Sequence, residues 1–164
     1  TITIDGNVSA TIKGTIGADS LIGNDGADTL EGRGGADTLT GGNRQDTFVF
    51  SSGDTGVLEA EADTITDFVS GNDRIDLTSV VGDNLGTYVE INGASNNFTK
   101  FSTNAGTSFS GAAVDIYVEY NLDGSGNTYV MIDEDSDGTV SAGDTLIILT
   151  GLSNADAVDS SDFI

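Results

Sequence analysis

The sequence contains no cysteine, histidine, proline or tryptophan. Without cysteine no disulfide can form, and without cysteine and histidine the usual ligands of zinc sites are missing. The same absence excludes a cysteine nucleophile and a serine–histidine pair. The longest apolar runs, such as residues 146–149, are far shorter than the roughly 20 residues of a membrane-spanning helix. The sequence therefore predicts a protein without disulfides, without a zinc site and without a transmembrane segment.

Basic residues are scarce: 5 lysines and arginines stand against 27 aspartates and glutamates, a formal net charge of −22. Nucleic-acid binding needs clusters of basic side chains, so this composition excludes it. A compact chain with so large a charge repels itself unless cations neutralise it. A solvated acidic surface of the halophilic kind explains the composition equally well. The arrangement of the acidic residues has to decide between these two interpretations.

Glycine is abundant, with 23 residues, and much of it falls in a nine-residue repeat over residues 14–49, "GTIGADSLI GNDGADTLE GRGGADTLT GGNRQDTFV". Each repeat begins with glycine and has aspartate at its sixth position, a small strand-forming residue at its seventh and a large apolar residue at its eighth. The repeated aspartates are Asp19, Asp28, Asp37 and Asp46, and the apolar residues are Leu21, Leu30, Leu39 and Phe48. A disordered glycine-rich linker would not keep these features in register.

Each repeat predicts a tight glycine turn followed by a short strand. One repeat cannot bury its apolar residue alone, so successive repeats must stack into a coil. With two repeats in each coil, Asp19 stacks on Asp37 and Asp28 stacks on Asp46. Facing carboxylates repel each other, and a hard dication between them removes the repulsion. Ca²⁺ accepts six to eight oxygen ligands, backbone carbonyls included, whereas Mg²⁺ demands a tight octahedron. The repeat therefore predicts several bound Ca²⁺ ions.

The repeat resembles the nonapeptide G-G-x-G-x-D-x-U-x of the RTX (repeats-in-toxin) calcium-binding proteins. This resemblance implies a parallel β-roll with calcium ions along both edges, each held by carbonyl oxygens and aspartates of two successive turns. On the first edge the implied ligands are Gly14, Ile16, Ala18, Asp19, Arg33, Gly35 and Asp37. On the second edge they are Gly23, Asp25, Ala27, Asp28, Gly42, Arg44 and Asp46. The fourth repeat departs from the pattern at Arg44, where glycine is expected.

The segments that flank the repeats predict caps. Residues 1–13 alternate apolar and polar side chains and predict an edge strand that closes the first coil. Residues 63–80 predict two strands joined by a turn, and this block resembles the one that follows the β-roll in serralysin-type proteases and alginate-epimerase R-modules. Asp54 or Asp63 is a candidate to complete the last calcium site of the roll. Aspartates that only solvate turns are the equal alternative.

Residues 85–150 predict further antiparallel strands. Val114, Ile116, Val118 and Tyr120 alternate along residues 114–120 and predict a strand with one apolar face. The other expected features are a strand pair over 127–132 and 145–149, a turn over 121–127, a polar loop between 92 and 113, and a short helix over 154–159 capped by Ser153 and Asp156. The predicted fold is thus all-β, a short parallel β-roll (residues 1–53) with an antiparallel β cap (residues 54–164).

A second calcium candidate is the stretch "DEDSDGTVSAGD", residues 133–144, which follows the ligand spacing of an EF-hand loop. The expected ligands are Asp133, Asp135, Asp137, the carbonyl of Thr139, Ser141 directly or through water, and Asp144. The twelfth position carries aspartate in place of the usual glutamate, and strands flank the loop in place of helices. The prediction is an EF-like calcium loop, with a plain acidic hairpin as the alternative.

The combined pattern favours a calcium-binding module that folds on calcium and serves type I secretion at the C-terminus of a larger bacterial protein. The resemblance implies an export signal in the C-terminal segment, "DAVDSSDFI", and a secreted or cell-surface location. The alternative is a calcium-dependent module for polysaccharide binding, adhesion or surface-layer anchoring. No enzymatic activity is expected, because H-E-x-x-H and G-x-S-x-G motifs are absent and the prominent acidic residues belong to turns or loops.

Overall fold

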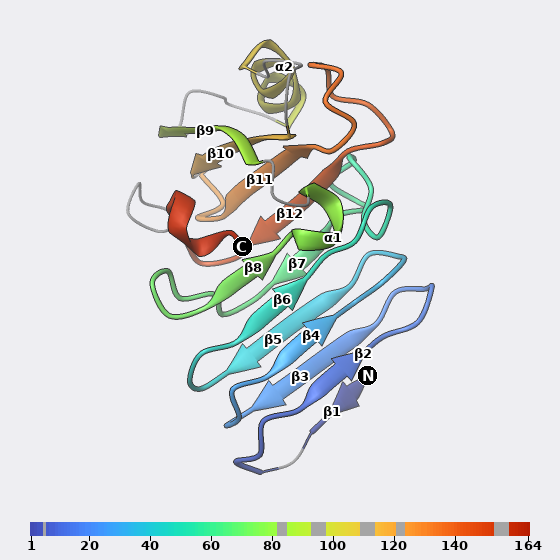
Figure 1. The fold of residues 1–164 in the computed structure, drawn as a ribbon, viewed down its shortest axis with the longest axis vertical. Helices are drawn as coiled ribbons and strands as arrows, with labels where there is room; N and C mark the ends of the chain where they lie inside the picture. Colours follow the sequence, from blue (N-terminus) through green and yellow to red (C-terminus); the bar gives the residue numbers. More distant parts are fainter. Residues whose placement is uncertain (5, 82–84, 93–97, 109–113, 121–123, 153–157) are drawn as a thin grey trace.

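The computed structural model describes residues 1–4, 6–81, 85–92, 98–108, 114–120, 124–152 and 158–164. Its lower part is a coil of stacked turns whose short strands alternate between two parallel sheets, and the chain climbs this coil from the N-terminus (Figure 1). The first sheet contains β1 (Ile2–Thr3), β3 (Ser20–Asn24), β5 (Thr38–Gly42) and β7 (Asp63–Ile65). The second contains β2 (Thr11–Lys13), β4 (Thr29–Glu31), β6 (Thr47–Val49) and β8 (Arg74–Asp76).

The register of these strands confirms the predicted 18-residue coil. Leu21 lies opposite Leu39 in the first sheet, and Leu30 lies opposite Phe48 in the second. These four side chains are 0% exposed and form a column between the sheets together with Ile12 and Ile65. The residues on either side of each column member face outward, which is the period of two that a strand imposes.

The first sheet continues past the roll into the cap. Its full order is β1-β3-β5-β7-β12-β11-β10-β9, so a single sheet spans both predicted segments, 1–53 and 54–164. The cap strands are β9 (Leu85–Asn92), β10 (Val114–Tyr120), β11 (Thr128–Asp133) and β12 (Thr145–Leu149). The antiparallel pairing of β11 with β12 confirms the predicted strand pair.

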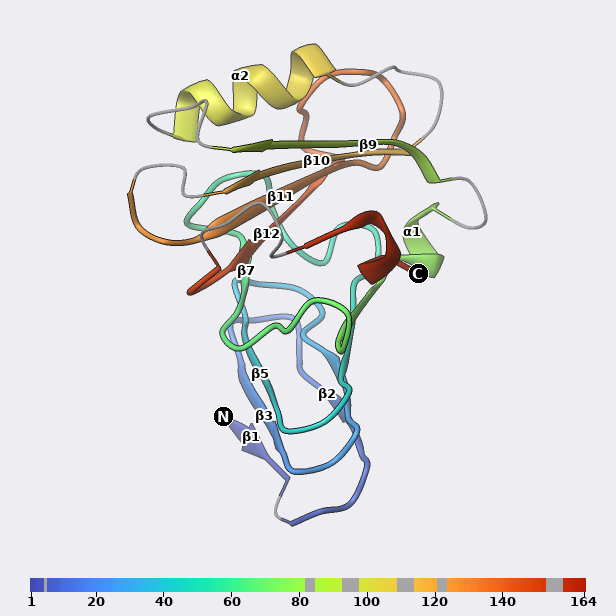
Figure 2. The ribbon, with the colours of Figure 1, turned by 90° about the vertical axis from the view of Figure 1, so that its left-hand side faces the viewer.

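Two expectations for the cap are wrong. β9 pairs with β10 in parallel, so the cap is not wholly antiparallel. The polar segment expected as a loop contains helix α2 (Phe98–Ser108), which lies across β9 and β10 (Figure 2). The helix forms because Phe98, Phe101 and Ala105 pack into a second core on the outer face of the sheet. None of the helices in the described ranges is long and apolar enough to cross a membrane.

The two faces of the cap strands serve two cores. Ile116, Val118 and Tyr120 face the core that continues from the roll, as the alternation predicted. Tyr117 and Tyr129 face α2, where the rings of Phe101 and Tyr117 have their centroids 5.6 Å apart. Residues 121–123 of the expected turn over 121–127 lie outside the described residues, and residues 124–126 form a bend, as expected. Of the helix expected over 154–159, residues 154–157 lie outside the described residues, and residues 158 and 159 are not helical.

The C-terminal segment, residues 158–164, closes the second sheet. A capping box between Asp159 and Asp162 starts a short 3₁₀ helix, Ser160–Asp162. Phe163 then forms a parallel bridge with Ile75 of β8, and the backbone N–H of Ile164 donates to the carbonyl of Ile75 at 3.0 Å. This closing rung protects an edge strand that would otherwise have unpaired backbone groups. Helix α1 (Thr78–Val81) follows β8 beside it.

Candidate metal centres

The repeat aspartates of the first edge form a ladder between coils. The backbone N–H of Asp19 donates to Oδ1 of Asp37 at 2.7 Å, and the N–H of Asp37 donates to Oδ1 of Asp63 at 2.8 Å. Each carboxylate therefore uses one oxygen to hold the turn below it. Asp37 is 1% and Asp63 0% exposed, so the upper two carboxylates lie inside the edge of the roll.

The second edge carries the same kind of ladder, displaced along the roll by half a coil. Oδ1 of Asp28 accepts from the N–H of Ala10 at 2.7 Å, and Oδ1 of Asp46 accepts from the N–H of Asp28 at 2.8 Å. Asp73 completes the column by accepting from the N–H of Asp46 at 3.0 Å. Asp28 and Asp46 are both nearly fully buried.

The second carboxylate oxygen of three of these residues lacks a donor. Among the described residues, Oδ2 of Asp28, Asp37 and Asp63 is buried without a hydrogen-bond partner. Burying a polar atom without a hydrogen-bond partner lowers stability by about 1–3 kcal/mol, and burying a charged oxygen costs more. Such atoms call for a cation or a proton. Here a buried Oδ2 without a partner recurs at equivalent positions of successive turns.

The first glycine of each repeat makes room for that oxygen. A Cβ added at Gly23 would lie 2.5 Å from both Oδ2 of Asp28 and the carbonyl oxygen of Gly41 in the next coil. An added Cβ at Gly32 or Gly41 would overlap Oδ2 of Asp37 or Asp46. Two oxygens that can only accept hydrogen bonds, Oδ2 of Asp28 and the carbonyl oxygen of Gly41, thus border the same small space beside Gly23, which we call the cradle. This arrangement suits a hard cation with oxygen ligands.

Burial and the charge of neighbouring carboxylates raise the pKa of four ladder carboxyls, Asp37, Asp46, Asp63 and Asp73. Burial, followed by the charge of Asp37 and Asp54, raises the pKa of Asp63 to about 8. Burial, with Asp73, Asp28 and Asp67 nearby, raises the pKa of Asp46 to about 6. The pKa of Asp37 is raised for the same reasons. These environments disfavour the ionised form unless a positive charge is present.

Asp19, at the bottom of the first edge, is different. Its Oδ2 accepts from the backbone N–H and the hydroxyl of Thr15 at 2.7 and 2.8 Å. These hydrogen bonds lower the pKa of Asp19. The lowest turn of the first edge therefore satisfies its own carboxylate, unlike the turns above it.

The carbonyl positions implied by the resemblance lie on the turns between these aspartates. Gly14 and Gly23 are buried, whereas Ile16, Ala18, Asp25, Ala27, Arg33, Gly35, Gly42 and Arg44 are exposed along the edges. Arg33 and Arg44 have φ angles of +69° and +81°, a left-handed conformation that favours glycine. Arg33 also donates to the Gly14 carbonyl at 3.4 Å, so a guanidinium stands at one predicted ligand.

Asp63 and Asp73 continue the two ladders, and sequence reasoning missed Asp73 altogether. The signal was present, because "DTI" and "DRI" repeat the aspartate, small or polar residue and apolar residue of each nonapeptide. The spacing concealed it: the hydrogen-bonded residues are 26 and 27 positions apart in place of 18. Asp67 also caps an edge by accepting from the backbone N–H groups of Gly41 and Gly42.

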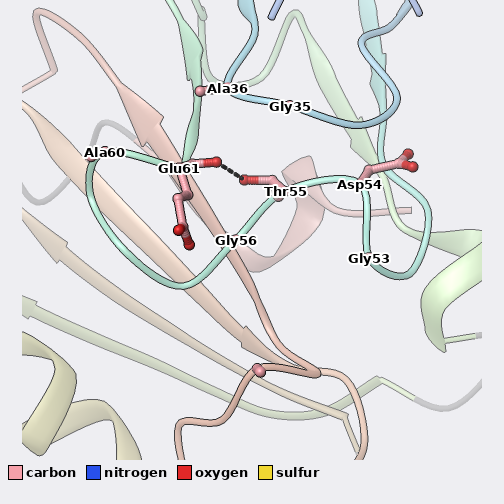
Figure 3. Close-up of a pocket in the computed structure, with 9 residues that line it drawn as sticks. Gly35, Ala36, Gly53, Asp54, Thr55, Gly56, Ala60 and Glu61 are labelled. Atoms are coloured by element: carbon pink, nitrogen blue, oxygen red, sulfur yellow. Dashed lines mark hydrogen bonds between the residues drawn. The ribbon is translucent and has the colours of Figure 1, made fainter. Parts of the chain in front are cut away.

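A cavity of about 350 Å³ lies where the roll meets the cap. It is lined by Gly35, Ala36, Gly53, Asp54, Thr55, Gly56, Ala60, Glu61 and Ala142. Figure 3 shows that the side chains of Asp54 and Glu61 point in different directions, so these two carboxylates do not converge. The Thr55 hydroxyl donates to the carbonyls of Glu61 and Leu146 and closes the loop. Asp54 acts on the ladder instead, because its charge raises the pKa of Asp63.

The acidic loop 133–144 brings three of its predicted ligands together. Carboxylate oxygens of Asp133, Asp135 and Asp137 all lie within 4.8 Å of one another. Asp133 is 0% exposed, and its Oδ1 is buried without a partner among the described residues. Burial, with Asp135 and Asp137 nearby, raises the pKa of Asp133. The other predicted ligands, Thr139 and Ser141, donate to Asp137 and Asp135 within the loop.

Asp144, expected at the twelfth position of the loop, is not part of this group. Its Oδ1 accepts from the backbone N–H of Glu134 at 3.0 Å, and its Oδ2 accepts from that of Ser141 at 2.6 Å. The carboxylate is almost fully buried, and burial raises its pKa to about 6. Asp144 therefore fastens the two ends of the loop.

Three of the five basic residues form ion pairs within the described part of the chain. Lys13 and Arg33 both contact Glu31 on the outer face of the second sheet. Arg74 pairs with Asp162 of the closing rung at 3.6 Å. These cations are far too few to offset the acidic residues, and none of these three pairs involves a ladder aspartate.

Comparison with known proteins agrees with this architecture. The sequence over residues 2–164 matches the family described as Peptidase M10 serralysin C terminal. No curated protein matches the chain. Among solved structures, the AlgE6R3 subunit of mannuronan C5-epimerase from Azotobacter vinelandii is similar, with 23% identity, a TM-score of 0.56, and coverage of 98% of this chain and 80% of that one. The AlgE6R2 subunit of the same enzyme has 21% identity, a TM-score of 0.42, and coverage of 97% and 92%.

The family match extends over both the roll and the cap, and the fold comparison with the epimerase subunit covers almost the entire chain. The nine-residue period of the sequence corresponds in the fold to repeated turns, to the two aspartate ladders and to a coil with one strand for each repeat. The chain therefore belongs to the serralysin C-terminal family and is a non-catalytic, calcium-binding β-roll module of the RTX type.

Proposed function

We propose that Ca²⁺ ions bound between successive turns drive the folding of this chain, and that this folding step serves type I secretion. The observation that carries the proposal is the cradle beside the first glycine of the second and third repeats, Gly23 and Gly32. There an unpartnered carboxylate oxygen, as in Asp28 or Asp37, lies close to the glycine carbonyl of the adjacent coil or to the glycine itself. A chain of net charge −22 needs cations at such positions.

The ladder divides the two oxygens of its aspartates between two tasks. Oδ1 holds the backbone of the neighbouring turn, and Oδ2 of Asp28, Asp37 and Asp63 is left to bind an ion. Oδ2 of Asp19 and of Asp73 also accepts a backbone N–H, from Thr15 and Val69, and would share that oxygen with the ion. The proposed ligands are Asp19, Asp28, Asp37 and Asp46 with the turn carbonyls named above, and Asp63 and Asp73 at the top of the two edges. A bound calcium ion would supply positive charge, and the otherwise unsatisfied oxygens would coordinate it. The loop 133–144 is a further proposed site, with Asp133, Asp135 and Asp137 as its carboxylates.

The energetics fit a folding switch. The raised pKa values of Asp46 and Asp63 mean that the ionised ladder is costly without a cation. Metal binding to a site that exists only in the folded state becomes folding free energy. Each site filled at about 100 times its dissociation constant adds about 2.7 kcal/mol. A few such sites reach the 5–15 kcal/mol that is typical of a whole domain.

Circular dichroism tests this mechanism. The chain is titrated with CaCl₂ and, in parallel, with MgCl₂, starting from excess EGTA. We expect a cooperative gain of β signal with calcium and little change at the same concentration of magnesium, because Mg²⁺ requires tighter octahedral geometry. A chain that already has its full β signal in EGTA would contradict the folding switch.

Export is the second part of the proposal. An unfolded, disulfide-free chain suits passage through a narrow channel, and folding outside the cell, where calcium is abundant, would follow. The proposed location is the extracellular medium or the cell surface, and the proposed partner is type I secretion machinery that recognises the C-terminal segment. The test is export of a reporter fused upstream of the chain from cells with a type I transporter. Equal export without residues 156–164 would contradict this role for the segment.

Binding of an acidic polysaccharide, with adhesion or surface-layer anchoring as related roles, is the second candidate. The supporting observation is limited to a fold shared with a subunit of an epimerase named for mannuronan. Lys13, Arg33 and Arg74 are already engaged with acidic groups, so calcium would have to bridge the polymer. Retention of the calcium-loaded chain on immobilised alginate, and its release by EGTA, would support this candidate.

A further inference from the structure

The turn from Val69 to Asp73 joins the second edge of the roll to the C-terminal segment, residues 158–164. On the inner side of this turn Asp73 is 3% exposed, and its Oδ1 accepts the backbone N–H of Asp46 at 3.0 Å. Its Oδ2 accepts the N–H of Val69 at 2.9 Å, which closes the turn. The direction of the Asp73 carboxylate, the uppermost of the second ladder, therefore depends on the conformation of the turn.

The outer side of the turn is held by a buried aspartate of the C-terminal segment. Oδ1 of Asp162 accepts the backbone N–H of Gly71, in the middle of the turn, at 2.9 Å. Oδ2 of Asp162 accepts the N–H of Asp159 at 3.0 Å as part of the capping box. Asp162 is 0% exposed, and a buried carboxylate is costly unless it is paired and hydrogen-bonded. Undocking the segment would therefore disturb both the capping box and the turn.

Arg74 links the two sides of the turn. Its Nη1 donates to the carbonyl of Asp73 at 2.7 Å and lies 3.6 Å from Oδ1 of Asp162. Its side chain is only 27% exposed, so solvent and salt screen this pair less than an ion pair on the open surface. The C-terminal segment also continues along β8 (Figure 1), where the N–H of Leu77 donates to the carbonyl of Ile164 at 2.7 Å. The segment therefore contacts both the turn and the strand that follows it.

We propose that Asp162 is a positioning residue for the calcium site at the top of the second edge, and that calcium at this site in turn holds the C-terminal segment in place. This inference rests on the proposed ladder sites, of which Asp46 and Asp73 form the uppermost on this edge. When residues 158–164 dock, Asp162 fixes the turn and thereby the carboxylate of Asp73. Coupling between two binding events is reciprocal, so an ion at Asp73 favours the docked segment by the same free energy.

This coupling bears on export, because the C-terminal segment is also the proposed recognition element for the transporter. In the docked segment Asp162 and Phe163 are 0% and 5% exposed, so little of either side chain is accessible to a partner. Calcium at the top of the second edge would keep them docked, and its absence would make their release easier. The same ion would thus withdraw the segment into the fold once the chain is outside the cell.

Calcium titration calorimetry of the whole chain tests this inference with Asp162→Asn. The substitution places an NH₂ group against one of the two backbone N–H donors that meet the carboxylate. We expect the affinity of one site to fall about 10- to 100-fold, a size typical of residues that orient a metal ligand. Asp159→Asn is the matched control, because it removes the same charge from the same segment while its amide oxygen can still accept the N–H of Ser161. It should leave that site within about twofold of the original chain.

Two further backgrounds separate positioning from a general loss of stability. Asp73→Asn removes a ligand of the coupled site, whereas Asp63→Asn removes the corresponding ligand at the top of the first edge. The effect of Asp162→Asn on calcium affinity should largely disappear in the Asp73→Asn background and persist in full in the Asp63→Asn background. Equal effects in both backgrounds would mean that Asp162 only stabilises the fold, and would overturn the inference.

Hydrogen exchange measures the reverse direction without any change in the C-terminal segment. Calcium should slow exchange of the Ile164 N–H, which donates to the carbonyl of Ile75, and Asp73→Asn should remove most of this protection while Asp63→Asn keeps it. Protection of Ile164 that does not depend on Asp73 would overturn the inference, as would a change of less than about twofold in calcium affinity for Asp162→Asn. If Asp73→Asn removes no site, the uppermost site of the second ladder fails and this inference fails with it. If the original chain binds no calcium, the proposed function itself fails.

Discussion

The backbone N–H of Asp19 donates to Oδ1 of Asp37, which lies one coil above it in the same edge of the roll, at 2.7 Å. The same bond joins Asp28 to Asp46, Asp37 to Asp63, and Asp46 to Asp73. One oxygen of each carboxylate therefore has a structural task that does not require a metal. The other oxygen is what distinguishes an aspartate from an asparagine at these positions.

Replacing a ladder aspartate by asparagine separates the structural role of Oδ1 from the proposed calcium-binding role of Oδ2. In Asp37→Asn or Asp28→Asn the amide oxygen still accepts the backbone N–H, while an NH₂ group replaces the oxygen that faces the cradle. We expect the coil to remain possible but each variant to need more calcium for folding, with a loss of about 2–3 kcal/mol at saturating calcium. Calcium titration followed by circular dichroism measures the shift. Asp25→Asn is the matched control, because its exposed side chain lies in the same turn and its carbonyl is unchanged.

Glycine at the first position of a repeat is required for space. In Gly32→Ala the new Cβ would overlap Oδ2 of Asp37 and lie 2.9 Å from its Cγ. Overpacking of this kind costs about 1–3 kcal/mol, and it also displaces the oxygen that faces the ion. We expect a lower Tm in calcium and a higher calcium midpoint. Gly17→Ala is the control, since nothing lies within 4 Å of its added Cβ, and an equal effect of both variants would contradict this explanation.

Arg44 occupies a position where glycine fits better. Its φ angle is +81°, and a left-handed conformation costs a non-glycine residue about 1–2 kcal/mol. Part of the gain in Arg44→Gly is lost to the greater freedom of the unfolded chain. We expect a net gain of about 0.5–1 kcal/mol in chemical unfolding at saturating calcium. Arg33→Gly should gain less, because Arg33 also bonds Glu31 and Gly14.

The stability of the calcium-free chain should fall as pH rises. The pKa of Asp46 is raised to about 6 and that of Asp63 to about 8 in the folded state. Between the unfolded pKa near 3.9 and these values the folded state binds more protons than the unfolded state, so raising the pH removes stability. Circular dichroism in excess EGTA should show more β structure at pH 5 than at pH 8. Excess calcium should remove most of this difference, and a chain whose EGTA spectrum is the same at both pH values would refute the prediction.

The closing rung should contribute much of the stability at the top of the roll. Phe163 is 5% exposed and lies against Tyr88, with ring centroids 5.9 Å apart. Phe163→Ala should therefore cost about 3–5 kcal/mol, measured by urea unfolding in calcium. Ile164→Ala changes a side chain that is 46% exposed and should cost far less. Similar losses in both variants would indicate that the backbone bridge to Ile75, and not the ring, holds the segment.

The sequence alone determined the roll. A period of nine residues fixes the turn, the strand and the buried side chain within each repeat, and the coil follows because a single repeat cannot bury Leu21 or Leu30 by itself. The carboxylates of Asp133, Asp135 and Asp137 were likewise predictable as a group, since alternate positions in one short loop are close in any compact conformation. These features depend on neighbours a few residues away, where pattern and geometry are tightly linked.

Only the tertiary structure decided the rest, because it depends on contacts between distant segments. Asp73 enters the second ladder through a loop of irregular length, so its period is hidden in the sequence. Helix α2 forms in a polar segment because Phe101 packs against aromatic side chains of β10 and β11. Asp162 meets Gly71 only because the C-terminal segment packs beside β8. In each case burial and pairing with a remote partner, and not local propensity, select the structure.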